Sequence, residues 1–292
     1  MRCSRVWPFL VIALVLTGNF VTTCMARAQT APVPTKTQVI AGAKVDLWLP
    51  PTGAGPHPLV LFSHGVSGCR DQSAYLMAAL AKAGMIVAAP DHDDQRCGQT
   101  LSPASLPPDI ANPALFKDER YAGRRDQLRA LRDTLVADPV LGPQINSAQL
   151  ALLGHSLGGY TVLAMAGARS GVPLTGLRAV VAVGPYLLSY AFGGAPKEVK
   201  VPVLFEAGAA DPASANLAEF LQRLGGPACA QVFPNANHFA WVDSPNLPRD
   251  LAQPEYQTAT ATAAVTFIEQ AFANGTAAAP GASTPSAQVA CK

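Results

Sequence analysis

Charged residues are scarce in this chain: they make up 14% of its 292 residues, whereas hydrophobic residues make up 49%. This composition excludes an intrinsically disordered chain, because such chains contain few hydrophobic residues. The formal net charge is +2, but Arg2, Arg5 and Arg27 lie in the first 28 residues, which contain no acid. Taking these three from the 21 basic residues leaves 18 against 19 acidic ones. Since no basic patch remains, we expect no nucleic-acid partner.

Long apolar runs are missing after the N-terminal region. No later segment offers the roughly 18 consecutive uncharged apolar residues that a membrane span needs. We therefore expect no stable membrane insertion. Residues 1–28 have the layout of a secretory signal peptide, with two early arginines, an apolar run at residues 6–16 and an Ala-Arg-Ala cleavage site. We expect a secreted or periplasmic protein after cleavage. A lipid anchor on Cys24 is the less favoured alternative, because a threonine precedes it where a lipobox has Gly, Ala or Ser.

Cysteine is sparse as well, and only Cys69, Cys97, Cys229 and Cys291 lie beyond the predicted signal peptide. Four cysteines in an exported protein permit three disulfide pairings. We favour Cys69 with Cys97, since both follow predicted strand ends at the same end of the sheet. We favour Cys229 with Cys291, which would tie down the C-terminal tail. Free buried thiols are the alternative for either pair.

Short apolar runs alternate with helical patterns from residue 58 onward. This alternation predicts right-handed βαβ crossovers and an α/β fold with a mostly parallel central sheet and helices on both faces. We expect one domain over residues 36–273, followed by a low-complexity tail at 274–292. One or two strands are expected within residues 37–49. Further strands are expected at residues 59–62, 85–89, 150–153, 179–183, 201–207 and, as the last one, 231–234, and the helices at 71–83, 118–136, 213–224 and 254–272.

Two segments of this pattern carry further expectations. In the helix at 118–136, leucines 128, 131 and 135 lie on the buried side, and the arginines at 124, 125, 129 and 132 lie mostly outward. Residues 91–116 are polar and proline-rich without clear periodicity, which predicts a long loop over one end of the sheet. Such loops are often lids or binding loops.

The strongest functional motif is Gly154-His155-Ser156-Leu157-Gly158, which lies between an apolar run and an alanine-rich helical segment. A G-x-S-x-G sequence between a strand and a helix places the serine at the apex of a tight turn, and the two glycines let the strand and the helix approach closely. The bare pattern can occur by chance in a glycine-rich chain. Its position between these two elements favours Ser156 as a nucleophile.

A serine nucleophile needs a general base, and the base needs an acid that orients it. The chain has five histidines, and only His238 follows Ser156, where the order nucleophile, acid, base places the base. For the acid we favour Asp211, in a short polar loop after a predicted strand, where functional groups gather in parallel sheets. Glu206 and Asp243 are the alternatives. Glu206 still belongs to the strand, and Asp243 lies only five residues after His238.

Acyl transfer also needs hydrogen-bond donors for the developing oxyanion. The backbone N–H of Leu157, at the start of the helix, is one candidate. The second is the N–H of Val66, because Gly65 permits the chain to turn in the loop after an early strand. His64 lies in the same loop and precedes the serine, so we expect a structural role for its ring rather than a catalytic one.

The sequence Asp-His-Asp-Asp at residues 91–94 contains side chains that can bind zinc or calcium. No second group of ligands accompanies it elsewhere in the sequence. We therefore interpret it as a hydrogen-bonded loop and predict no metal site. Tyr186 and Trp241 are candidate walls of a substrate pocket by position alone, with ordinary packing as the alternative.

These motifs resemble those of the α/β-hydrolase superfamily. Ser63-His64-Gly65, the Arg-Arg-Asp-Gln-Leu sequence at 124–128, the serine motif at 154–160 and the placement of Asp211 and His238 are similar to the exported, serine-type dienelactone-hydrolase-like group. That group is related to platelet-activating-factor acetylhydrolases and cutinase-like polyester hydrolases. The resemblance covers residues 36–272 and implies carboxylic-ester hydrolysis without a cofactor. Dienelactone hydrolases proper have a cysteine nucleophile where Ser156 stands, so dienelactone activity is not implied.

From these observations we predict a serine carboxylic-ester hydrolase that acts on small or short-chain esters through an acyl-enzyme. Its expected partner is a small-molecule ester, and we favour a monomer. A lipase or polyester hydrolase is the first alternative, because a mobile loop at 91–116 could expose an apolar groove. A non-catalytic binding protein with a hydrolase fold is the second, although such proteins usually lack one of the three catalytic residues.

Overall fold

The computed structural model describes residues 32–51, 53, 55–99, 106–169, 174–244, 247, 251, 253–276, 279 and 287–292. The predicted signal peptide at 1–28 lies outside these residues, as do residues 277, 278 and 280–286 of the predicted tail. All the described residues belong to one compact unit of the chain. Within them, no helix has the length and apolar character needed to cross a membrane.

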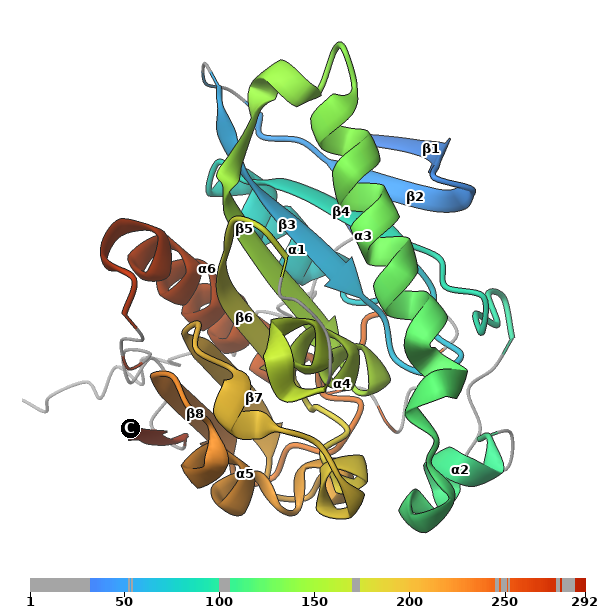
Figure 1. Cartoon of the computed structure of the whole chain (residues 1–292), viewed down its shortest axis with the longest axis vertical. Coiled ribbons are helices and arrows are strands. Elements are labelled where there is room, and N and C mark those ends of the chain that lie inside the picture. The colour runs from blue at the N-terminus through green and yellow to red at the C-terminus, as the bar shows by residue number, and fades with distance from the viewer. Residues whose placement is uncertain are drawn as a thin grey trace, which may run out of the picture. The chain divides into compact units, whose positions relative to one another are not determined.

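A sheet of nine strands organises this unit, in the order β1-β2-β4-β3-β5-β6-β7-β8-β9 (Figure 1). The six strands from β4 to β8 in this order run parallel, and the outer strands β1, β2 and β9 pair antiparallel. The predicted mostly parallel sheet is confirmed. The bounds are β1 Lys36–Ile40, β2 Ala43–Trp48, β3 His57–Ser63, β4 Ile86–Pro90, β5 Ile145–His155, β6 Leu177–Val183, β7 Val203–Gly208, β8 Ala228–Phe233 and β9 Gln288–Cys291.

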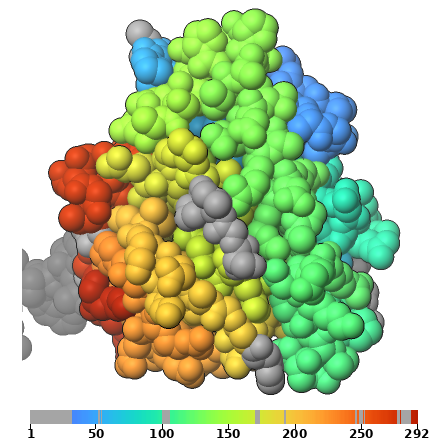
Figure 2. Space-filling model, in the orientation of Figure 1, coloured from blue at the N-terminus to red at the C-terminus, as the bar shows by residue number. Residues whose placement is uncertain are grey.

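The central strands are continuous apolar runs because helices cover them on both faces. Helices α1 (Ala74–Lys82) and α6 (Gln257–Asn274) pack on one face of the sheet. Helices α3 (Ala122–Ala137), α4 (Leu157–Leu163) and α5 (Leu217–Arg223) pack on the other (Figure 1). Figure 2 shows this second face, where the green surface of α3 and the residues before it borders the yellow and orange surface of later elements.

Short helices account for several differences from the predicted helix boundaries. Three predicted helices begin with a separate 3₁₀ turn, a frequent arrangement at helix N-termini. Among its described residues, the predicted loop at 91–116 contains a short α-helix, α2 (Pro108–Ala111), and the 3₁₀ turn Pro113–Leu115, both of which are too short to produce a periodic pattern. A π-helical turn, Ala164–Ala168, follows α4. The 3₁₀ turns are Pro113–Leu115, Asp118–Tyr121, Gly142–Gln144, Leu188–Phe192, Pro196–Glu198, Pro212–Ser214 and Pro254–Tyr256.

The strand predicted as the last one is β8, but β9 follows it from within the predicted tail. Residues 288–291 pair antiparallel with β8, and Cys229 of β8 lies opposite Cys291. These two cysteines form a disulfide with their Cα atoms 4.1 Å apart, and Cys69 and Cys97 form a second one. Both favoured pairings are therefore present. The sequence pattern does not predict β9, because four residues after a low-complexity segment are too few to show alternation.

Candidate active site

Ser156 lies at the sharp turn between β5 and α4, with φ 57° and ψ −119°. A positive φ is uncommon for a residue other than glycine, and such strained positions cluster at functional sites. The turn depends on the flanking glycines. A Cβ on Gly158 would lie 1.8 Å from the carbonyl oxygen of Ser63, and one on Gly154 would lie 2.4 Å from the Gly158 backbone. The G-x-S-x-G motif thus supplies the close approach that the turn requires.

The structure brings the predicted base and acid to this serine. His238, in the loop after β8, has its Nε2 atom 2.9 Å from Ser156 Oγ. Its Nδ1 atom lies 2.9 Å from Asp211 Oδ1. Asp211 follows β7, and its carboxylate also accepts hydrogen bonds from the Ala213 N–H and the Ser214 hydroxyl. The three side chains therefore form a continuous hydrogen-bonded chain from hydroxyl to imidazole to carboxylate.

Neither alternative acid takes this place. Glu206 is fully buried within β7, and burial raises the pKa of its carboxyl well above the ordinary value. Asp243 instead accepts hydrogen bonds from the N–H groups of Ala74 and Tyr75, both at 2.9 Å, at the start of α1. Among the described residues, no hydrogen bond joins either carboxyl to His238.

The two predicted oxyanion donors flank the serine. Leu157 begins α4, so its N–H has no partner within the helix. Val66 lines a cavity that also contains Ser156. The turn before it lies close to the nucleophile, since a Cβ on Gly65 would be 3.3 Å from Ser156 Cβ. The Val66 and Leu157 amides thus remain the candidates for binding an oxyanion.

Gln72 and His155, which sequence reasoning did not select, connect the loops on either side of the serine. The Gly65 N–H donates to Gln72 Oε1 at 3.2 Å, and Gln72 Nε2 donates to His155 Nδ1 at 2.7 Å. His155 Nε2 then donates to the His238 carbonyl oxygen at 3.0 Å. Burial and the neighbouring His238 lower the pKa of His155 to about 3, so the ring is neutral, with one donor and one acceptor as this chain requires.

Arg124 corrects the prediction that it lies on the outer side of its helix. Its side chain is only 4% exposed and points under the loop that follows β3. It forms an ion pair with Asp94 and donates to the backbone carbonyls of His64 and Gly65. The spacing of residues along a helix places an arginine on the solvent side by its charge alone. It cannot show that Arg124 is buried, because its partner Asp94 lies 30 residues away in the sequence.

His64 has the structural surroundings expected for it. Its Nε2 accepts from the N–H of His92 at 2.9 Å, and its Nδ1 donates to the Gly65 carbonyl at 2.7 Å. Burial, reinforced by the Arg124 charge, lowers the pKa of His64 to about 4. Through these two hydrogen bonds the neutral ring holds the loop in place. It does not line the cavity beside Ser156.

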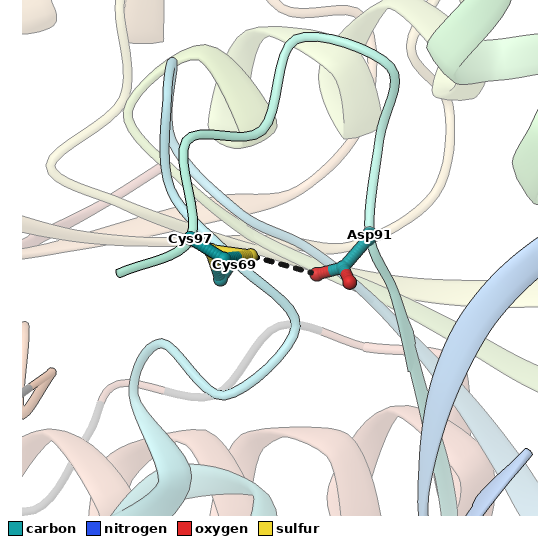
Figure 3. Close-up of side chains that lie close together, drawn as sticks. All are labelled: Cys69, Asp91 and Cys97. Atoms are coloured by element: carbon teal, nitrogen blue, oxygen red, sulfur yellow. Dashed lines mark hydrogen bonds between the residues drawn. A yellow bond between two sulfur atoms is a disulfide. The ribbon is translucent and has the colours of Figure 1, made fainter. Parts of the chain in front are cut away.

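Side chains of the Asp-His-Asp-Asp sequence bond to separate protein partners rather than converging on one point. Asp91 pairs with Arg70 at 2.8 Å, and His92 hydrogen-bonds to Ser63 and Gln127. Asp91 also approaches Cys97, whose sulfur lies 3.6 Å from its carboxylate, with Cys69 alongside (Figure 3). Because the disulfide consumes both thiols, this group offers no thiolate to a metal.

A cavity of about 380 Å³ opens beside Ser156 and His238. Tyr186 lines it, as predicted for a pocket wall. Trp241 does not: its ring is fully buried in the core on the α6 side of the sheet, where Nε1 donates to Thr260 Oγ1 at 3.0 Å. Most other lining side chains are apolar, among them Val66, Leu106, Ile110, Leu188, Ala213, Phe239 and Val242.

Helix α2 forms one wall of this cavity and is anchored on both sides. The Tyr186 hydroxyl donates to the Ile110 carbonyl at 3.1 Å. The Tyr121 hydroxyl donates to Asp109 at 2.9 Å, and Arg120 pairs with the same carboxylate at 3.4 Å. These contacts hold α2 against the elements that carry Tyr121 and Tyr186.

Comparisons with known proteins agree with this fold. The chlorophyllase family model matches residues 16–188, more than half of the chain. No curated protein matches the sequence. A solved structure of dienelactone hydrolase from Anabaena variabilis ATCC 29413 superposes with a TM-score of 0.55 and 22% identity, over 80% of this chain and 95% of that one. That similarity confirms the predicted α/β-hydrolase fold. The chain therefore belongs to the chlorophyllase family and is a hydrolase of the α/β-hydrolase superfamily.

Proposed function

We propose that this hydrolase is a serine carboxylic esterase that works through an acyl-enzyme on small, uncharged esters. The observation that carries the proposal is the chain from Ser156 Oγ to His238 Nε2 and from His238 Nδ1 to Asp211, with both distances 2.9 Å. A hydroxyl, an imidazole and a carboxylate in this order can generate an oxygen nucleophile near neutral pH.

In the proposed reaction, His238 Nε2 accepts the Ser156 proton while Oγ attacks the ester carbonyl carbon. The carbonyl oxygen becomes an oxyanion, to which the Val66 and Leu157 amides donate. His238 then passes the proton to the departing alcohol, which leaves the acyl group on Ser156. Water, deprotonated by the same histidine, attacks the acyl carbon, and His238 returns that proton to Ser156 Oγ as the bond to the acyl group breaks and the acid leaves. Asp211 holds the imidazole tautomer and stabilises its charged form.

The lining of the cavity supports small, uncharged substrates. Its volume of about 380 Å³ lies near the lower end of the range for small-molecule sites, about 300–1,000 Å³. Among the described lining residues, Asp211 is the one carboxylate, and there is no lysine or arginine to bind a substrate carboxylate. The anchored α2 wall supports small esters over polymers, which need an open groove.

We also propose that the protein works outside the cytoplasm. Two disulfides support this assignment, because disulfides persist in oxidising compartments and are rare in reducing ones.

The deciding experiment combines active-site labelling with a substrate series. A fluorophosphonate probe should label Ser156 in the wild type and not in Ser156→Ala, which should fold normally and lose hydrolysis by about 10⁴-fold or more. Over p-nitrophenyl acetate, butyrate, octanoate and palmitate, kcat/KM should be highest for the short chains. A maximum at palmitate would favour a lipase, and the absence of labelling and hydrolysis would favour a binding protein.

A further inference from the structure

We propose that Arg124 is a positioning residue for the oxyanion hole: clamped by Asp94, it holds the Gly65–Val66 peptide so that the Val66 N–H faces Ser156. The inference rests on the proposed esterase function. It assigns a role to a buried cation that the reaction steps above do not use.

The Arg124 guanidinium donates hydrogen bonds to one carboxylate and two backbone carbonyls. Nε donates to Asp94 Oδ1 at 3.0 Å and Nη2 to Asp94 Oδ2 at 2.8 Å. Nη1 donates to the His64 carbonyl at 2.6 Å, and Nη2 also donates to the Gly65 carbonyl at 3.1 Å. A planar guanidinium can make these bonds together only if the loop carbonyls and the carboxylate keep fixed relative positions.

The Gly65 carbonyl is held by more than this one cation. It also accepts from the Gly68 N–H at 3.1 Å and from His64 Nδ1 at 2.7 Å. In a trans peptide the carbonyl and the following N–H point in opposite directions. With the Gly65 oxygen turned toward Arg124, the Val66 N–H points to the other side of the loop, where Val66 and Ser156 line the same cavity.

The other polar group of Gly65 is also fixed, since its N–H donates to Gln72. Among the described residues, no protein acceptor takes the Val66 N–H. The loop therefore presents this N–H toward the cavity before any substrate binds. A donor that needs no reorientation during the reaction is the arrangement that stabilises an oxyanion best.

Burial of this cation is costly unless each donor is satisfied, and a packed apolar side chain could support the loop at lower cost. The neighbouring Arg125 provides the contrast. It makes a two-pronged ion pair with Asp118, in the 3₁₀ turn that precedes α3, and among the described residues none of its hydrogen bonds reaches the loop after β3. Two adjacent arginines thus make similar ion pairs, and only Arg124 contacts the loop that carries Val66.

The test compares Arg124→Lys with Arg125→Lys on a short p-nitrophenyl ester, with kcat expressed per serine titrated by a fluorophosphonate. Lysine keeps the charge but cannot grip two carbonyls and a carboxylate together. We expect Arg124→Lys to lower kcat by roughly 10–100-fold, since full loss of one oxyanion donor costs about 10²–10³-fold. KM should change little, and Arg125→Lys should behave like the wild type.

A boronic acid inhibitor separates positioning from general support of the fold, because its tetrahedral adduct places an oxygen where the oxyanion forms. Its inhibition constant should rise in Arg124→Lys in parallel with the loss of kcat/KM. A purely structural role would lower the melting temperature or the fraction of titratable serine and leave kcat per serine unchanged. That outcome would overturn the inference, as would an equal loss in Arg125→Lys.

Asp94→Asn keeps the test decisive if Arg124→Lys does not fold. This variant retains the guanidinium and its carbonyl contacts but weakens the clamp, so a smaller loss of kcat with the same boronate signature is expected. Wild-type kcat per serine in a folded Asp94→Asn variant would count against the clamp. Failure of the proposed function looks different, because the wild type itself would then neither hydrolyse esters nor react with the probe.

Discussion

His155 donates a hydrogen bond from Nε2 to the carbonyl oxygen of His238, so the residue before the candidate nucleophile holds the backbone of the candidate base. His155→Phe should break this link and leave the Gln72 amide without its acceptor. We expect kcat to fall by about tenfold or more and the free energy of unfolding to drop by about 1–3 kcal/mol. Ester kinetics and urea unfolding measure both. His57→Phe is the control, because His57 bonds to Gly84 at the far end of β3 and should leave kcat unchanged.

The choice between the two carboxyl groups on and after β7 is directly testable. Asp211→Asn should lower kcat by about 10²–10⁴-fold, because the amide no longer holds His238 in the productive tautomer. Glu206→Gln should leave kcat near the wild-type value, since the buried Glu206 carboxyl accepts from Thr260 and makes no hydrogen bond to His238 among the described residues. Steady-state kinetics of the two isosteric variants decide the matter. The reverse pattern would move the role of the acid to Glu206.

Tyr186→Phe removes one hydroxyl and, with it, the hydrogen bond to the Ile110 carbonyl that anchors α2. A looser wall should admit longer acyl chains. We expect the ratio of kcat/KM for octanoate over butyrate to rise several-fold, with a loss of stability of about 1 kcal/mol. An unchanged ratio would show that this anchor does not limit chain length.

We expect the two disulfides to differ in what their removal changes: one affects stability alone, and the other affects both stability and kcat. Replacing Cys229 and Cys291 by serine removes a link that spans 62 residues, and we expect a loss of about 2–4 kcal/mol in unfolding free energy with little change in kcat. Replacing Cys69 and Cys97 should also lower kcat, because this pair joins the loop after β3 to the segment that carries Asp94. Equal effects of the two replacements on kcat would contradict this.

Buried histidines should make the protein less stable in mild acid. The folded-state pKa values of His64 and His155, about 4 and about 3, lie below the ordinary value of 6.5. The unfolded chain therefore binds more protons as pH falls below 6.5, and stability is lost toward the folded values. We expect the free energy of unfolding to fall by about 2 kcal/mol for each histidine between pH 7 and pH 5.

Urea unfolding at both pH values measures this loss. Glu206 and Asp243, whose pKa values are raised, act in the opposite direction, because an acid with a raised folded pKa favours the folded state as pH falls. The difference between wild type and His155→Asn therefore isolates one histidine. His155→Asn should lose less stability than the wild type between pH 7 and pH 5. The same loss in both proteins would refute this account.

Sequence patterns predicted those parts of the molecule that depend on residues close together in the chain, or on a residue type that occurs only once after Ser156. Apolar runs predicted the parallel strands, the glycine spacing predicted the turn at Ser156, and the lack of any other downstream histidine pointed to His238. The contacts of Arg124 and the position of Trp241 depend on residues distant in the chain. The residues next to Arg124 in the sequence do not show that its side chain is buried under a loop. Those next to Trp241 do not show that its ring lies in the core.

Strand β9 changes what the sheet presents at its edge. Unpaired backbone groups on a long apolar edge strand are templates for strand addition by other chains. Here the parallel strand β8 is covered by a strand of only four residues, tethered by a disulfide, and the opposite edge is the antiparallel strand β1, which carries Lys36. Short or charged edge strands discourage such pairing. With β9 in place, neither edge of the described sheet presents one of the apolar parallel strands to other chains.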